Sequence, residues 1–184
     1  MKKLVGKFIL FLFGWKTTFK KENYAKKCVM IAAPHTSNWD FVFAMAFYWK
    51  EGIQANFFIK DTWTKGIHGW FIKKMGGIGV ARGKNNNLVD ASVTAFSERE
   101  ELILLVPAEG TRKRVKRWKR GFYVIAKKAN VPVSLGYLDY KKKIAGIDML
   151  FNLTEDLTED MTKIEDFYKN IHGKFPENYN PKIF

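Results

Sequence analysis

A histidine and an aspartate five positions apart, His35 and Asp40, are the residues of this sequence whose types best suit acid–base chemistry. Histidine is the usual base for removing a proton from an alcohol at neutral pH, because its ordinary pKa lies near working pH. Such a base also needs a carboxylate on its other ring nitrogen, which fixes the tautomer and stabilises the imidazolium. If the turn after His35 brings Asp40 back to it, the pair can activate a hydroxyl group for nucleophilic attack.

Two other arrangements of the same residues stay open. Ser37 could be the nucleophile of a Ser-His-Asp system, but the sequence has no Gly-x-Ser-x-Gly elbow, and a hydroxyl that caps the next helix is the simpler interpretation. His35, Asp40 and Glu109 could also bind a metal ion. A zinc site would need a further histidine or cysteine nearby, so we expect no metal at these residues.

A second cluster, "PAEGTRKRVKRWKRG" at 107–121, is suited to binding phosphate. Gly110, Thr111 and Arg112 offer a backbone N–H, a hydroxyl and a guanidinium fork, which are common phosphate ligands. From Arg112 to Arg120 seven of nine residues are basic, and the outer ones are equally compatible with a solvated loop. Glu109 should be ionised in so basic a setting, and it could orient a hydroxyl or an arginine.

A third polar segment follows "GGIGV" and contains Arg82 and Lys84. Its glycines do not have the Gly-x-Gly-x-x-Gly order of a dinucleotide-binding turn. Arg82 is a candidate ligand for a phosphate or carboxylate, and Lys60 is a weaker candidate of the same kind.

The elements that must position these residues alternate along the chain. Apolar runs of strand length occur at 28–34, 55–60, 77–82, 102–108, 131–140 and 143–151. Helical segments are expected at 40–52, 65–76, 85–99, 121–130 and 157–173. This order predicts a single α/β domain with a largely parallel, mixed central sheet flanked by helices. The polar segments would meet beyond the carboxyl ends of its strands, where ligands of such sheets usually bind.

The N-terminal segment, residues 1–27, differs from the rest of the chain in character. It reads "MKKLVGKFILFLFGWK" at its start, with lysines around an apolar run that is too short for a spanning helix of about 20 residues. No small-residue cleavage site follows, so we expect a helix that lies in the membrane interface with its lysines on anionic head groups. The alternative is a first helix packed on the protein's own core. Residues 28–184 would form the domain that carries the chemistry.

The net charge of +14 favours a polyanionic partner. It is uneven, since residues 1–143 carry 28 Lys and Arg against 10 Asp and Glu, whereas residues 144–184 carry 4 against 8. Charge alone also fits a nucleic-acid-binding module or a lipid-surface protein without catalysis. The sequence has no recognisable nucleic-acid-binding motif, so we expect no nucleic acid.

Taken in order, the polar blocks resemble the glycerolipid acyltransferase superfamily, whose best-known members make phosphatidic acid from lysophosphatidic acid. The matching blocks are His35 to Asp40 with Ser37 between them, "GIGVAR" ending in Arg82, "EGTR" at 109–112, and Val131, Pro132 and Val133. The chain is similar to the short, single-domain bacterial members. It departs from the usual pattern at Pro34, Ala81 and Ala108, and the last two put the identity of the acceptor in doubt.

The resemblance implies a glycerol-3-phosphate acyltransferase-like fold and an O-acyltransferase of phospholipid biosynthesis. His35 would deprotonate the hydroxyl of a lysolipid acceptor, and Asp40 would hold the ring. The donor would be a fatty acyl thioester, either acyl-CoA or acyl-carrier protein, with no further cofactor, and the protein would lie peripherally on an anionic membrane at the cytoplasmic face of the inner membrane. The implied acceptor- and acyl-binding residues are Ser37, Lys60, Arg82, Glu109, Gly110, Thr111, Arg112, Val131, Pro132 and Val133.

Overall fold

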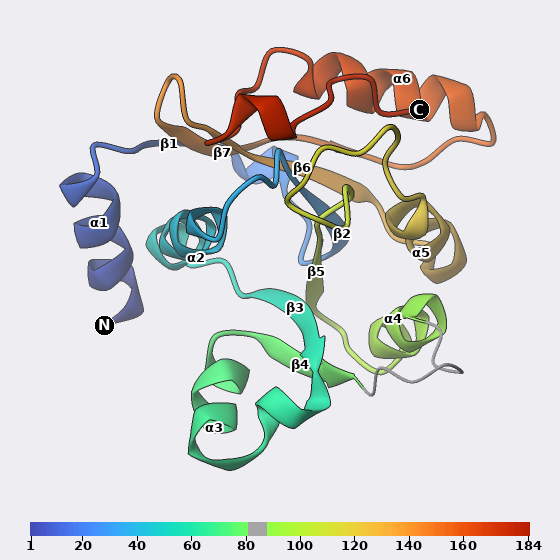
Figure 1. Ribbon diagram of the computed structural model, residues 1–184. Coiled ribbons are helices and arrows are strands. Elements are labelled where there is room, and N and C mark those ends of the chain that lie inside the picture. Colours follow the sequence, from blue (N-terminus) through green and yellow to red (C-terminus); the bar gives the residue numbers. More distant parts are fainter. Residues whose placement is uncertain (81–87) are drawn as a thin grey trace.

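The computed structural model describes residues 1–80 and 88–184, which form an α/β domain built on one mixed sheet (Figure 1). The strands are β1 (Lys16–Phe19), β2 (Lys27–Ala33), β3 (Ala55–Lys60), β4 (Gly77–Val80), β5 (Leu102–Val106), β6 (Val133–Asp139) and β7 (Ile144–Phe151). The α-helices are α1 (Lys2–Leu12), α2 (Trp39–Glu51), α3 (Gly66–Lys74), α4 (Leu88–Ser97), α5 (Gly121–Ala129) and α6 (Leu157–Tyr168). Short 3-10 turns are η1 (Lys21–Asn23), η2 (Asp61–Thr64) and η3 (Pro176–Asn178).

Within the described residues the sheet has the strand order β1-β7-β6-β2-β5-β3-β4. Strands β6, β2, β5, β3 and β4 are parallel to one another, as the alternation of strands and helices predicts. Strand β7 returns antiparallel to β6 after a short turn, and β1 pairs parallel with β7 at the edge. The predicted fold, a largely parallel mixed sheet flanked by helices, is confirmed.

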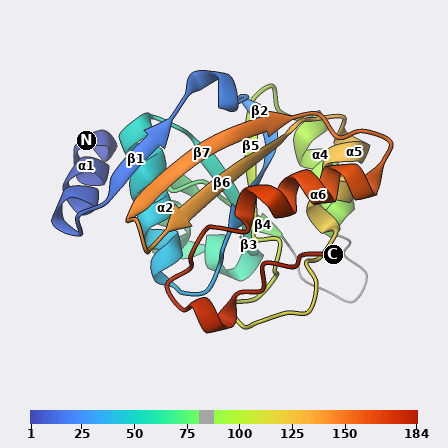
Figure 2. The same ribbon diagram turned by 90° about the horizontal axis from the view of Figure 1, so that it is seen from above.

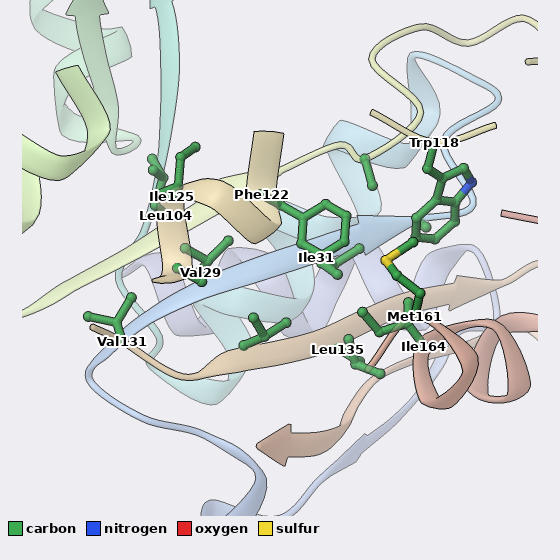
Figure 3. Close-up of a cluster of buried hydrophobic side chains, with 14 of the residues drawn as sticks. Val29, Ile31, Leu104, Trp118, Phe122, Ile125, Val131, Leu135, Met161 and Ile164 are labelled. Atoms are coloured by element: carbon green, nitrogen blue, oxygen red, sulfur yellow. The ribbon is translucent and has the colours of Figure 1, made fainter. Parts of the chain in front are cut away.

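Strand β2 shows why the domain has a core on each side of the sheet. Its side chains alternate between the two faces, so Val29 and Ile31 pack with α4, α5 and α6, while Cys28 and Met30 pack with α1 and α2. Figure 3 shows the first cluster, in which Val29 and Ile31 lie near side chains of α5 and α6. Burial raises the pKa of the Cys28 thiol to about 12, so this cysteine is a neutral core residue.

Helix α1 packs on α2 with one face and exposes the other. Gly6 and Leu10 are buried, and a Cβ at Gly6 would overlap the backbone of α2 at Ala46. The opposite face exposes apolar side chains, namely Leu4, Val5, Phe8, Phe11 and Leu12. Among the described residues no helix has the length and apolar character needed to cross a bilayer. One face of α1 therefore packs on the protein's own core, and attachment of the other face to a membrane stays a prediction.

Two elements differ from the sequence-based expectations. Strand β1 was not predicted, because four residues of mixed character, "KTTF", carry no clear periodicity. Helix α6 ends at Tyr168 rather than near Gly173. The carbonyl of His172 accepts a hydrogen bond from the backbone N–H of Tyr140 at 2.9 Å, so the chain has left the helix to join the turn after β6. Figure 2 shows α6 from above, with the turn between β6 and β7 at the end of the sheet.

Candidate active site

The turn between β2 and α2 brings His35 and Asp40 together. His35 follows the carboxyl end of β2, Asp40 lies in the first turn of α2, and Nδ1 of the imidazole is 3.1 Å from Oδ2 of the carboxylate. Asp40 is buried, whereas the His35 ring is partly exposed. Among the described residues, Nε2 of His35 has no hydrogen-bond partner. The ring is therefore held through one nitrogen and leaves the other available.

Asp40 also accepts hydrogen bonds from three other groups. The backbone N–H groups of Thr36 and Ser37 donate to Oδ2 at 2.8 Å, which closes the turn around the carboxylate. The hydroxyl of Tyr140 donates to Oδ1 at 2.6 Å. Burial first, and then the hydrogen bond to Asp40, raises the pKa of Tyr140 well above its ordinary value, so the phenol keeps its proton and remains a donor. These bonds fix the direction of the carboxylate toward His35.

Glu109 holds the turn from the neighbouring strand. It follows β5, is buried, and both its carboxylate oxygens accept from the backbone N–H of His35, at 3.1 and 3.0 Å. Burial raises the pKa of Glu109 to about 7, although the hydrogen bond from His35 opposes that shift. The sequence-based expectation was an ionised Glu109, but a buried carboxyl with this pKa is only partly ionised near neutral pH.

The raised pKa of Glu109 should make the free energy of unfolding depend on pH. Since the pKa of Glu109 is higher in the folded protein than its ordinary value of 4.5, the folded state binds more protons and loses stability as the pH rises from about 4.5 to 7. We expect the free energy of unfolding of the wild type to fall by about 3 kcal/mol over this range relative to Glu109→Gln. Urea unfolding at several pH values measures the difference. A difference between wild type and Glu109→Gln that does not change with pH would contradict the raised pKa. The control is Glu177→Gln, which replaces a glutamate at an exposed position.

His35, Glu109 and Tyr140 follow the carboxyl ends of three adjacent parallel strands, β2, β5 and β6. The sheet itself therefore brings together groups that lie 74 and 100 positions apart in the chain. This is the edge at which the sequence predicted that the polar segments would meet.

A cavity of about 620 Å³ opens beside His35 and Asp40. It lies between α2, α4, α5 and the carboxyl ends of the strands, and its size is in the usual range for small-ligand sites. Most of its lining is apolar, and it includes Ala33, Phe41, Phe47, Phe58, Leu105 and Phe122. Gly110 and Lys119 contribute the polar loop after β5. An imidazole with one nitrogen free thus stands at the polar end of an apolar chamber.

Comparison with protein families finds a match to Acyltransferase over residues 16–134, which is more than half of the chain and includes His35, Asp40 and Glu109. The chain belongs to the acyltransferase family. Comparison with curated proteins finds no match. Among solved structures, the crystal structure of the 1-acyl-sn-glycerophosphate (LPA) acyltransferase, PlsC, from Thermotoga maritima is similar in fold. It has a TM-score of 0.66 and 15% sequence identity over 91% of this chain and 75% of that one.

Family membership confirms the predicted resemblance and favours an enzyme over the nucleic-acid-binding and non-catalytic hypotheses. In this acyltransferase the "EGTR" loop lies against the turn of His35. Nη1 of Arg112 hydrogen-bonds Oδ1 of Asn38 at the start of α2, and Gly110 has a positive φ of 69° in the turn that follows Glu109. Thr111 accepts a hydrogen bond from the backbone N–H of Lys113 at 3.3 Å.

The other predicted site residues lie at different distances from this turn. Ser37 Oγ accepts from the N–H of Trp39 at 3.2 Å, as a helix-capping hydroxyl does. Lys60 is exposed at the end of β3. Val131, Pro132 and Val133 lie at the amino end of β6, and none of them is among the described residues that line the cavity. Arg82 lies outside the described residues.

Two features of the site were not found from the sequence. Tyr140 was treated as the end of a strand, and no spacing signal connects it to Asp40. Lys119 was counted with the outer basic residues of its loop, yet it lines the cavity, and its backbone N–H donates to the carbonyl of Ala108 at 2.9 Å. Within the described part of the chain, no three His, Cys, Asp or Glu side chains are grouped to hold a metal ion.

Proposed function

We propose that this acyltransferase moves a fatty acyl group from a thioester to the hydroxyl of a lysophospholipid. The observation that carries the proposal is the His35–Asp40 pair at the polar end of an apolar cavity. Family membership and the similarity in fold to an LPA acyltransferase support it.

His35 is the base in the proposed reaction. Nε2 takes the proton of the acceptor hydroxyl while its oxygen attacks the thioester carbonyl carbon. Collapse of the tetrahedral intermediate breaks the carbon–sulfur bond, and the leaving thiolate takes the proton from the imidazolium. Asp40 holds Nδ1–H and stabilises the imidazolium. The products are an ester and a free thiol, so no cofactor is required beyond the activated donor.

The cavity would hold the acyl chain. Phe41, Phe58 and Phe122 give it apolar walls, and each methylene buried there adds about 0.8 kcal/mol to binding. Val131 and Val133 belong to the same buried cluster as Phe122. Their proposed contribution to the acyl pocket is therefore support of its wall through packing.

The acceptor's phosphate would bind at the "EGTR" loop, where Gly110 and Thr111 precede Arg112. Arg82 and Lys60 remain further candidates for binding the same group. The hydrogen bond of Arg112 to Asn38 supports this assignment, since it places the guanidinium beside the turn that carries His35. A guanidinium fork is well suited to a phosphate.

The kinetics of the Arg112→Ala variant test whether Arg112 binds the phosphate of the acceptor. We expect KM for lysophosphatidic acid to rise about tenfold or more, because a charge-assisted hydrogen bond to phosphate contributes about 1.5–3 kcal/mol. KM for monoacylglycerol, which has no phosphate, should stay unchanged and serves as the control. Equal effects on the two acceptors would contradict a phosphate site at Arg112.

A direct assay tests the reaction and its donor. Purified protein with lysophosphatidic acid and either acyl-CoA or acyl-carrier protein should release free thiol and form a diacyl product detected by mass spectrometry. The donor that gives the higher kcat/KM is the one used. Release of thiol without a new ester would indicate a thioesterase, and no release with several lysolipids would favour a lipid-surface protein without catalysis.

Tyr140→Phe tests whether the phenol positions the carboxylate. Phenylalanine keeps the contacts of the ring with Trp15 and Phe43 but removes the donor to Asp40. We expect the free energy of unfolding to fall by about 2 kcal/mol and kcat to fall about tenfold. Tyr123→Phe removes a similar phenol–carboxylate bond, to Asp160, on α5 and should lower stability without changing kcat. Equal kcat for the two variants would contradict a positioning role.

We further propose that the exposed face of α1 attaches the protein peripherally to an anionic membrane, at the cytoplasmic face of the inner membrane. The 11-residue helix presents Leu4, Phe8 and Phe11 to solvent, and exposed Lys3 and Lys7 lie among them. An exposed apolar face with lysines beside it is typical of helices that lie in the interface.

A further inference from the structure

A second exposed apolar surface lies on η2 and α3, far from α1 in the sequence. Its members are Trp63, Ile67, Trp70 and Phe71, whose exposed fractions are 61%, 89%, 64% and 54%. Ile67, Trp70 and Phe71 follow helical spacing and so share one stripe of α3. An amphipathic helix normally turns such a stripe toward the core, whereas α3 turns it toward solvent.

Glycines fix α3 in this orientation. A Cβ at Gly69 would overlap the backbone of Thr64 in η2, and a Cβ at Gly77 would overlap the side chain of Ile72. Gly69 is the buried residue of α3, so the face that packs on the protein is made by the smallest side chain and the bulky ones point away. The exposure of Trp70 and its neighbours is therefore built into the packing of η2, α3 and β4.

The η2–α3 surface adjoins the start of α1. Nζ of Lys2 donates to the carbonyl of Lys74 at 2.7 Å, which joins the start of α1 to the end of α3. At the other end of α1, the first turn of α2 exposes Trp39, and Phe13 after α1 packs on this ring at a centroid distance of 5.6 Å. Figure 1 shows α1 and α3 lying away from α5 and α6.

The charge around the surface is positive. Exposed Lys60, Lys65, Lys73 and Lys74 lie on or beside η2 and α3, and Asp61 is the one carboxylate of residues 60–74, paired with Lys65 at 3.2 Å. Tryptophans with lysines around them suit the boundary between acyl chains and anionic head groups.

We propose that η2 and α3 form a second membrane-binding element, which inserts Trp63, Ile67, Trp70 and Phe71 into the interface of an anionic bilayer. The inference deepens the proposed peripheral attachment, which by itself rests on α1. Phe41 is exposed on α2 and also lines the cavity, so the cavity lining reaches the protein surface at α2, the helix on which α1 packs. Membrane contacts through both α1 and η2–α3 would hold this part of the protein against the lipid.

Binding to vesicles tests the proposal in the full chain. The probe is sedimentation with phosphatidylcholine vesicles that contain 30 mol%, or no, phosphatidylglycerol. We expect Ile67→Ser/Trp70→Ser to lower the partition coefficient on the anionic vesicles about tenfold or more, because two large apolar side chains no longer leave water. Val124→Ser, which removes an exposed apolar side chain on α5, is the matched control and should bind as the wild type does.

Tryptophan fluorescence with brominated acyl chains shows contact directly. Trp63→Phe/Trp70→Phe keeps the surface apolar, so binding should be retained while a large part of the quenching by brominated lipid disappears. Undiminished quenching in this variant, or unchanged partition of the serine variant, would overturn the proposal. A wild type that is dimeric without lipid and becomes monomeric on serine substitution, with vesicle binding unchanged, would assign the surface to a second copy instead.

Acyl transfer separates this inference from the proposed function. With acceptor and donor dispersed in detergent, the serine variant should keep the wild-type rate, whereas its rate on vesicles should fall with its binding. If the wild type binds vesicles through α3 but transfers no acyl group, the proposed function fails and the second membrane contact stands. If the wild type transfers acyl groups and the serine variant binds vesicles normally, the proposed function stands and the second membrane contact fails.

Discussion

Replacing His35 by alanine should lower kcat for acyl transfer roughly 10³-fold or more, because the hydroxyl of the acceptor then loses its base. The fold should survive. The bond that joins this turn to Glu109 comes from the backbone N–H of residue 35, which alanine keeps, and Asp40 retains its donors from Thr36, Ser37 and Tyr140. Thiol release, followed together with the new ester by mass spectrometry, measures the loss.

The comparison for this variant is His68→Ala, which removes an exposed histidine on α3. Assayed with substrates in detergent, it should keep the wild-type rate. Activity of His35→Ala within a few fold of the wild type, with an unchanged far-UV spectrum, would eliminate His35 as the base and with it the proposed mechanism.

Two substitutions of Asp40 should separate its catalytic role from its structural one. Asp40→Asn keeps an acceptor for the N–H groups of Thr36 and Ser37 but no longer offers a negative charge to the imidazolium. We expect kcat to fall about 10²- to 10⁴-fold while most stability remains. Asp40→Ala leaves those N–H groups and the hydroxyl of Tyr140 buried without an acceptor. It should lower the free energy of unfolding by about 3–6 kcal/mol, a large share of a typical total.

Asp160 supplies a matched control. It is fully buried and accepts hydrogen bonds from the backbone N–H of Thr154 at 2.9 Å and the hydroxyl of Tyr123 at 3.1 Å, away from the cavity. Asp160→Asn should cost stability with kcat unchanged. If Asp40→Asn lowered kcat no more than Asp160→Asn did, the carboxylate of Asp40 would be structural only.

The layout of the site could be predicted because a parallel sheet turns sequence order into spatial order. Polar residues that follow buried strands must meet at the carboxyl edge, and His35 and Glu109 do so. Strand β3 at 55–60 was predicted with its observed bounds. Such elements can be predicted from the sequence because their apolar pattern reflects local burial alone.

Properties that depend on three-dimensional surroundings could not be predicted in the same way. The protonation of Glu109 follows from which way its side chain points, and the sequence shows only its basic neighbours. The bond between Tyr140 and Asp40 joins residues 100 positions apart, for which no spacing rule exists. Strand β1 forms because the edge of β7 offers partners, a cause that lies outside its own four residues.

The crossing of α1 over α2 at Gly6 has a consequence for where the reaction takes place. Gly6 meets α2 at Ala46, six residues after Asp40, which is about 9 Å along the helix axis. If α1 lies at the bilayer boundary, its packing on α2 fixes the distance between the His35 imidazole and the acyl chains. An acceptor would then need to rise by only part of its own length to present its hydroxyl, and its tail could stay among its neighbours until the ester has formed.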